Sequence, residues 1–159
     1  MIRFNKEGLK AEEQFIKLAE KKYKFVKKST LYQDRHQHFD VMVKFNNHPL
    51  ANMERIEIKS LKAFSKGTSK RSDWIFVEFK NVNGHADKMA FEMPDHFLLV
   101  DRKDLVKLSE SKVNRKIFVK KPQDAKYRVY RRKDRPDEMV SLVRTEDVIQ
   151  NCKCSIWKK

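Results

Sequence analysis

Three residues able to do chemistry stand on two short segments with alternating apolar positions. Asp40 lies in residues 39–45 (FDVMVKF), and Glu57 and Lys59 lie in residues 55–60 (RIEIKS). Such alternation is typical of strands with one buried face. The Asn-Asn-His-Pro sequence between the segments favours a turn, so the two segments predict a hairpin. If the apolar faces share one core, the two carboxylates and the lysine converge on the other side of the hairpin.

Two carboxylates at close range repel each other, which raises the pKa of one of them unless a cation lies between them. Carboxylate oxygens are ligands that suit Mg²⁺ or Mn²⁺. A neighbouring lysine can orient a metal-bound water or stabilise negative charge on a phosphate. The set therefore suits metal-assisted hydrolysis of a phosphodiester. The alternative is a solvated strand face that carries a cross-strand ion pair.

The composition favours a polyanionic partner. The chain has 159 residues, 37 lysines and arginines and 22 acidic residues, for a net charge of +15 spread along its length. A single domain with this charge attracts nucleic acid. A membrane partner is not expected, because the sequence contains neither a basic amphipathic helix with an aromatic face nor an apolar run of membrane-spanning length. No signal peptide is visible, so a cytoplasmic location is expected, in the host if the chain is viral.

Helical and strand-like patterns alternate along the rest of the chain. Helices are expected at 7–22 and 102–109 and after Thr145, which is a suitable N-cap, and further strands at 74–80, 97–100, 116–119, 127–131 and 139–143. These elements predict a mixed α/β fold with a leading helix and a central sheet. Cys152 and Cys154 are too close for an ordinary disulfide and are expected to be reduced, and one Cys-x-Cys pair supplies too few ligands for zinc.

The order of these motifs resembles the PD-(D/E)XK nuclease superfamily. Residues 8–12 (GLKAE) are similar to the start of the first helix in its Holliday junction resolvases. Asp40 matches the aspartate of the PD half-motif, although Phe39 replaces the proline, and residues 57–59 (EIK) match (D/E)xK. Segments such as DWIFVEFKNVNG also look like uncharacterised phage proteins of that superfamily. The resemblance covers residues 8–108.

The resemblance implies a restriction-endonuclease-like fold, with a mixed central sheet, a leading helix and flanking helices. The whole chain would be one nuclease domain, in which residues 109–159 extend the sheet or form an accessory element. By the same resemblance, Glu12, Asp40 and Glu57 would ligate Mg²⁺ or Mn²⁺, and Lys59 would assist the attacking water.

Other residues compete for roles in this site. Glu13 lies beside Glu12, and the choice between them stays open, although the spacing from the glycine favours Glu12. A second Glu-x-Lys pattern, with Glu78 and Lys80, could provide a further metal ligand or substrate contact, or only an exposed strand face. His38 shares the face of the hairpin aspartate and could ligate metal, contact phosphate or simply be solvated.

A basic loop follows the proposed metal-binding strand. Its cations are Lys62, Lys66, Lys70 and Arg71. They are expected to bind the backbone phosphates of nucleic acid; the alternative is that they only make the surface more soluble.

Three functions remain open at this stage. The leading hypothesis is a metal-dependent endonuclease acting on DNA, with branched DNA such as Holliday junctions as one substrate class. A junction enzyme is expected to be a two-fold homodimer, because it makes two symmetric cuts. The alternatives are an RNA or single-strand nuclease with the same metal site, and a nucleic-acid-binding protein without catalytic activity.

Overall fold

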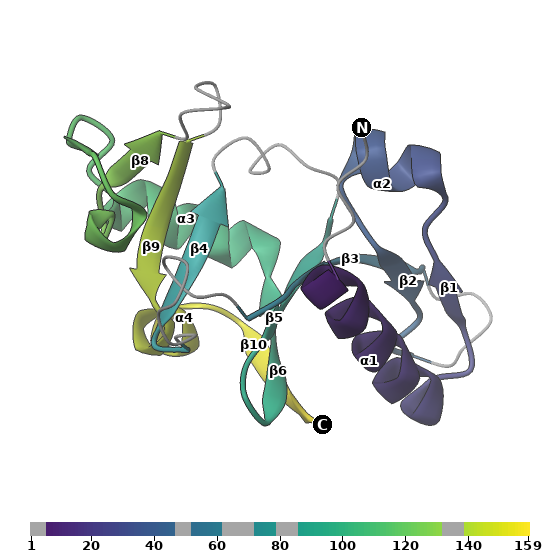
Figure 1. The fold of residues 1–159 in the computed structure, drawn as a ribbon. Helices are drawn as coiled ribbons and strands as arrows, with labels where there is room; N and C mark the ends of the chain where they lie inside the picture. Colours follow the sequence, from purple (N-terminus) through teal and green to yellow (C-terminus); the bar gives the residue numbers. More distant parts are fainter. Residues whose placement is uncertain (1–5, 47–51, 62–71, 79–85, 132–138) are drawn as a thin grey trace. The chain divides into compact units, whose positions relative to one another are not determined.

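A computed structural model describes residues 6–46, 52–61, 72–78, 86–131 and 139–159 (Figure 1). The chain divides into two compact units. Unit 1 contains Met1–Leu61, Gly84–Val100 and Ser155–Lys159, and unit 2 contains Lys62–Asn83 and Asp101–Cys154. Whether the whole chain folds as one domain stays a prediction.

The larger sheet has six strands in the order β1-β2-β3-β5-β6-β10. Their bounds are β1 Val26–Lys28, β2 Val41–Val43, β3 Glu54–Lys59, β5 Lys88–Glu92, β6 His96–Asp101 and β10 Cys154–Lys158. Strands β2 and β3 are antiparallel, as the sequence predicts, with Val41 opposite Ile56. On its other side β3 pairs in parallel with β5, with Lys59 opposite Phe91. This mixed pairing positions the end of β3, where the candidate site lies.

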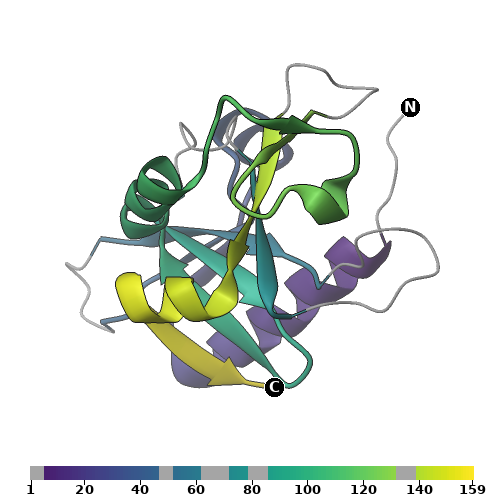
Figure 2. The same ribbon diagram turned by 90° about the vertical axis from the view of Figure 1, so that its left-hand side faces the viewer.

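The predicted leading helix is α1, Lys6–Lys22, and it lies along one face of this sheet (Figures 1 and 2). Its buried residues, Ala11, Phe15 and Ala19, are spaced by four and so form one apolar stripe. Acidic Glu7 in the first turn and two lysines in the last turn also suit the helix dipole.

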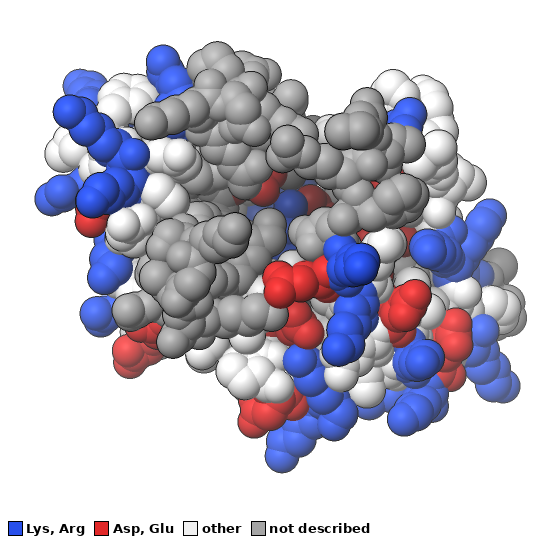
Figure 3. Space-filling model, viewed as in Figure 1, with Lys and Arg blue, Asp and Glu red and all other residues white. Residues whose placement is uncertain are grey.

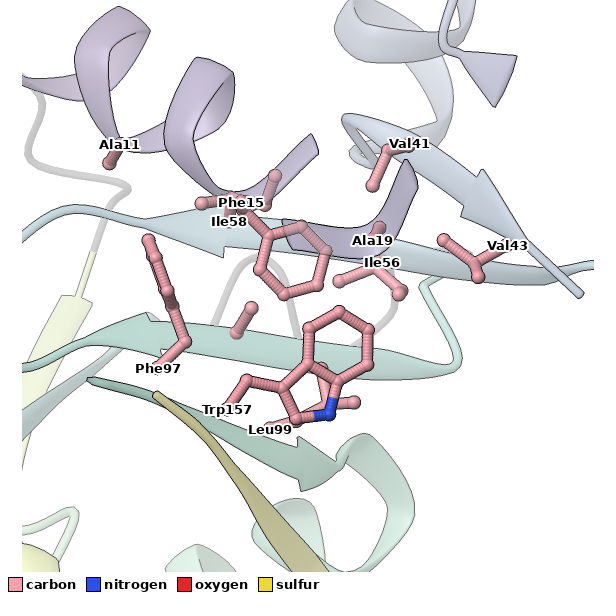
Figure 4. Close-up of a cluster of buried hydrophobic side chains, with 11 residues drawn as sticks. Ala11, Phe15, Ala19, Val41, Val43, Ile56, Ile58, Phe97, Leu99 and Trp157 are labelled. Carbon is pink, nitrogen blue, oxygen red and sulfur yellow. The ribbon is translucent and has the colours of Figure 1, made fainter. Parts of the chain in front are cut away.

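The core of unit 1 forms where this stripe meets the sheet (Figure 4). The ring of Phe15 stacks on Trp157 with centroids 4.9 Å apart and meets Phe97 edge-on at 5.4 Å. Apolar side chains of β2 and β3 complete the cluster: Val41, Val43, Ile56 and Ile58. Burial of these alternating residues fixes which faces of β2 and β3 point towards α1.

Unit 2 contains a four-stranded sheet in the order β4-β9-β8-β7. Its strands are β4 Trp74–Glu78, β9 Met139–Arg144, β8 Val129–Arg131 and β7 Phe118–Val119, and its helical segments are α3 Arg102–Lys112, η2 Pro122–Asp124 and α4 Thr145–Asn151. Strand β4 pairs antiparallel with β9, and β7 pairs in parallel with β8. The fold is thus mixed α/β, as predicted, but its strands form two mixed sheets where one central sheet was expected.

The remaining differences from the predicted elements are local. Helix α2, Leu31–Gln37, was not expected; it begins with a capping box in which the side chains of Thr30 and Gln33 each bind the other's backbone N–H. Strands β1, β5 and β10 were also not expected. The N-cap of α4 is Arg144. The prediction of Thr145 as N-cap is wrong, because its hydroxyl donates to the carbonyl oxygen of Ser72 at 2.6 Å. Among the described residues, no helix is long and apolar enough to cross a membrane.

Candidate functional site

Asp40 is held by its backbone and by its side chain. Its N–H donates to the Ile56 carbonyl at 2.8 Å, and its own carbonyl accepts from Ser29 N–H at 2.9 Å. Its Oδ2 accepts a 2.6 Å hydrogen bond from the backbone N–H of Ile58. The carboxyl group therefore lies beside the backbone of β3 and is only 8% exposed. Alternation along the strand predicts a face for this side chain, but not this bond.

Asp40 belongs to a cluster of three carboxyl groups. Burial raises its pKa well above the usual range, against the Ile58 N–H, which lowers it. A hydrogen bond with the Glu12 carboxyl group and the negative charges of Glu12 and Glu57 raise it further. These surroundings favour the protonated form of Asp40 unless a cation lies beside it.

Glu57 and Lys59 stand two residues apart on β3, on the same side of the strand. Lys59 Nζ lies 2.9 Å from Glu57 Oε1, and their side chains are 24% and 11% exposed. Ile56 and Ile58 occupy the alternate positions and belong to the core of unit 1. The structure thus brings the Lys59 ammonium group beside Glu57, and it places Glu57 and Glu12 close enough to Asp40 to act on its carboxyl group.

The structure distinguishes Glu12 from its neighbour. Glu12 is half-buried and bonded to Asp40, whereas Glu13 is exposed. Glu12 directly follows Ala11, a residue of the buried stripe of α1, so its side chain leaves the helix close to the sheet. Packing of α1 on the sheet therefore selects Glu12 as the member of the pair that reaches the cluster.

Glu92, which the sequence analysis did not single out, fixes the chain just after Lys59. Its Oε1 accepts from Leu61 N–H at 2.9 Å, and its Oε2 lies 3.0 Å from Lys159 Nζ. The parallel pairing of β5 with β3 places Glu92 at this end of the sheet. The sequence analysis missed this residue because residues 88–92 were not assigned to a strand next to β3.

The lower-priority candidates lie on other elements of the fold or outside the described residues. His38 is the left-handed C-cap of α2 (φ 54°) and is half-buried. It is not among the groups that act on the Asp40 carboxyl group. Glu78 ends β4 in the four-stranded sheet of unit 2, and it is half-buried. Lys80 lies outside the described residues, as does the whole set of loop cations, Lys62, Lys66, Lys70 and Arg71. Their proposed roles stay predictions.

The carboxylate oxygens of Glu12, Asp40 and Glu57 are the type of ligand that a hard divalent cation prefers. In the structure, however, they are not arranged around a common metal position. Within the described parts of the chain, no group of three or more His, Cys, Asp or Glu side chains meets the geometry for holding a metal ion. Oxygens of Asp40 are engaged by Ile58 N–H and by Glu12. A metal ion here would compete with these hydrogen bonds and would favour the deprotonated form of Asp40. Cys152 and Cys154 are free thiols, as predicted.

Comparison with protein-family models, with curated proteins and with solved structures gives no match.

Proposed function

We propose that this chain is a Mg²⁺- or Mn²⁺-dependent endonuclease that hydrolyses phosphodiester bonds in DNA. The observation that carries the proposal is the buried Asp40 carboxyl group, crowded by Glu12 and Glu57. Burying acidic groups together destabilises a fold unless a cation or a proton compensates them. Strongly perturbed carboxyl groups of this kind concentrate at functional sites.

Each residue of the cluster has a role in this proposal. Asp40, Glu57 and Glu12 would hold the metal through their oxygens. When bound, the metal would polarise the phosphate and lower the pKa of a coordinated water. Lys59 would orient the attacking water or stabilise charge on the phosphate, from its position beside Glu57. The resemblance to PD-(D/E)XK nucleases assigns the same roles to these residues.

DNA is the preferred substrate in this proposal. The net charge of +15 attracts any nucleic acid, and the likeness of the first helix to Holliday junction resolvases favours branched DNA. Cutting a junction symmetrically would require a two-fold homodimer.

A cleavage assay tests the proposal. The purified chain is incubated with labelled four-way junction, duplex DNA, single-stranded DNA and RNA, each with Mg²⁺, Mn²⁺ or a chelator. We expect cleavage of DNA that depends on metal, and no cleavage by Asp40→Asn, which keeps an oxygen acceptor for Ile58 N–H. Cleavage of RNA alone would move the proposal to a ribonuclease. Binding of these substrates without any metal-dependent cleavage would contradict it in favour of a non-catalytic binding protein.

A further inference from the structure

The most basic part of unit 2 is the segment Lys112–Arg131, called here the basic segment. It contains one acidic residue, Asp124, and eight cationic residues: Lys112, Arg115, Lys116, Lys120, Lys121, Lys126, Arg128 and Arg131. All eight are exposed. The segment thus carries a net charge of +7, nearly half that of the chain. Figure 3 shows lysine and arginine side chains gathered over the region of β8 that Figure 1 labels.

The basic segment is a folded part of the four-stranded sheet. It contains β7, the turn η2 and β8, with β7 at the edge of the sheet. Backbone bonds connect its ends: Val129 N–H donates to Ile117 carbonyl at 2.9 Å, and Asn114 N–H donates to Tyr127 carbonyl at 2.9 Å. Ala125, within the segment, is fully buried. The cations are therefore held on a defined backbone, which lowers the entropy lost when they bind a ligand.

An exposed aromatic ring lies among these cations. Phe118, on the edge strand β7, is 53% exposed, and its neighbour Ile117 is 41% exposed. The guanidinium carbon of Arg131 lies 4.9 Å from the centroid of the Phe118 ring. An exposed phenylalanine with a planar cation beside it and phosphate-binding groups around it matches the components of a single-strand stacking site.

We propose that the basic segment binds a single strand of nucleic acid, with phosphates on its cations and an unpaired base stacked on Phe118. Charge complementarity identifies a polyanion. The exposed ring favours an unpaired base, because the bases of an intact duplex are already stacked on each other. An anionic membrane fits less well, since burying Phe118 in hydrocarbon would draw the guanidinium of Arg131 in with it. The inference concerns binding alone and does not depend on the carboxyl cluster.

The test uses fluorescence anisotropy of a labelled oligothymidylate with the full chain in EDTA. We expect Phe118→Ala and Phe118→Leu each to weaken binding about tenfold, because both remove the stacking surface, and Phe118→Tyr to bind like the parent. Tyr32→Ala is the matched control, since Tyr32 is an exposed aromatic residue (65%) on α2 of unit 1. This control should leave the affinity unchanged.

A charge-matched pair of variants tests the cations. The first changes four exposed lysines of the basic segment to alanine: Lys116, Lys120, Lys121 and Lys126. The control changes four exposed lysines of unit 1: Lys17, Lys21, Lys27 and Lys28. The slope of log affinity against log salt should flatten by about 0.7 for each phosphate that no longer has a lysine bound to it. We expect this flattening in the first variant and little in the control.

Several outcomes would overturn the inference. Equal flattening in both lysine variants would mean that binding depends on overall charge and on no particular surface. Parental affinity of Phe118→Leu would exclude stacking, and tighter binding of a hairpin duplex would exclude a single-strand site. Binding of the chain to phosphatidylserine vesicles is a further outcome, with binding abolished by Phe118→Ala and kept by Phe118→Leu. That result would assign the surface to a membrane. All of these measurements are made in EDTA, where metal-dependent cleavage does not occur, so the presence or absence of nuclease activity does not affect their result.

Discussion

The Glu-x-Lys pattern begins on two strands of the chain, at Glu57 on β3 and at Glu78 at the end of β4. The structure gives these two glutamates different surroundings. Glu57 is buried, ion-paired with Lys59 and close enough to Asp40 to raise its pKa. Glu78 is half-buried in the other sheet, where its cross-strand neighbour is the apolar Val140. The chemistry open to a Glu-x-Lys pattern therefore depends on the residues that strand pairing places beside it.

The free-energy cost of burying a carboxyl group also differs between the surroundings of Asp40 and those of Glu78. Near Asp40, burial and two further carboxyl groups favour protonation, so the folded chain must take up a proton or bind a cation. Glu78 is more exposed and can keep part of its hydration. A costly cluster with no evident packing advantage is more consistent with a functional site than with a structural one.

The largest expected effect compares the two glutamates directly. Glu57→Gln should reduce metal-dependent cleavage to the level of the assay without metal, because it removes a proposed metal ligand and the partner of Lys59. Glu78→Gln should cut at close to the parental rate. Single-turnover cleavage with each variant at saturating enzyme checks this. An equal loss of cleavage in both variants would mean that Glu57 on β3 has no greater role in cleavage than Glu78 on β4.

The next effect concerns the two lysines. Lys59→Ala should lower the cleavage rate by about 100-fold to 10,000-fold, the range typical of a group that positions or protonates a reacting water. Lys80→Ala should change it much less. Rates are compared at saturating substrate, so that weaker phosphate binding does not contribute. The reverse order of effects would move the catalytic residues to the Glu78 pattern.

A smaller effect separates the neighbouring glutamates of α1. Glu12→Gln should reduce cleavage and metal affinity by at least about tenfold, because it removes one of three proposed ligands and even the loss of an outer-shell partner costs that much. Glu13→Gln, on the exposed side of the helix, should behave like the parent. Measuring the cleavage rate at increasing Mn²⁺ concentrations gives both the maximal rate and the apparent metal affinity. A larger reduction for Glu13→Gln would mean that α1 presents the other residue to the site.

The smallest effect is on stability without metal. The folded pKa of Asp40 is raised above its ordinary value of 3.8, so the folded state holds the proton over a pH range in which the unfolded state has released it. Stability from this group is present at low pH and is lost as pH rises through the folded pKa. Asp40→Asn should therefore raise Tm in EDTA, by about 2–4 °C per kcal/mol gained.

Thermal melts at pH 5 and pH 8 check this prediction, and the gain in Tm should be larger at pH 8. Glu78→Gln provides the control, with little change at either pH. A Tm for Asp40→Asn that falls at both pH values would mean that the carboxyl group stabilises the fold and that the cluster is structural.

Alternation and helical periodicity were sufficient to predict α1, β2 and β3, the elements that carry or adjoin the residues of the carboxyl cluster. Apolar residues at every second position of β2 and β3 predicted the hairpin and the side shared by Glu57 and Lys59. The helical stripe that contains Phe15 predicted α1. Each of these patterns is local, so a short stretch of sequence contains all of the information needed.

Other features depend on contacts between distant residues. Strand β4 pairs with β9, and β5 takes the place beside β3. No local pattern determines which strands become neighbours in a sheet. The bond from Ile58 N–H to Asp40 and the anchoring of Leu61 by Glu92 arise from this arrangement. Alternation along a strand predicts the face on which a side chain lies, but not whether its oxygens already accept hydrogen bonds.

The most direct test of the account is Mn²⁺ binding by the carboxyl cluster, measured by isothermal titration calorimetry in the absence of nucleic acid. The account predicts that the parent chain and Glu78→Gln bind Mn²⁺ alike, and that Asp40→Asn and Glu57→Gln each lose most of that affinity. Mn²⁺ binding that survives in both cluster variants, or that disappears in Glu78→Gln, would contradict the assignment of the metal site to Asp40 and Glu57.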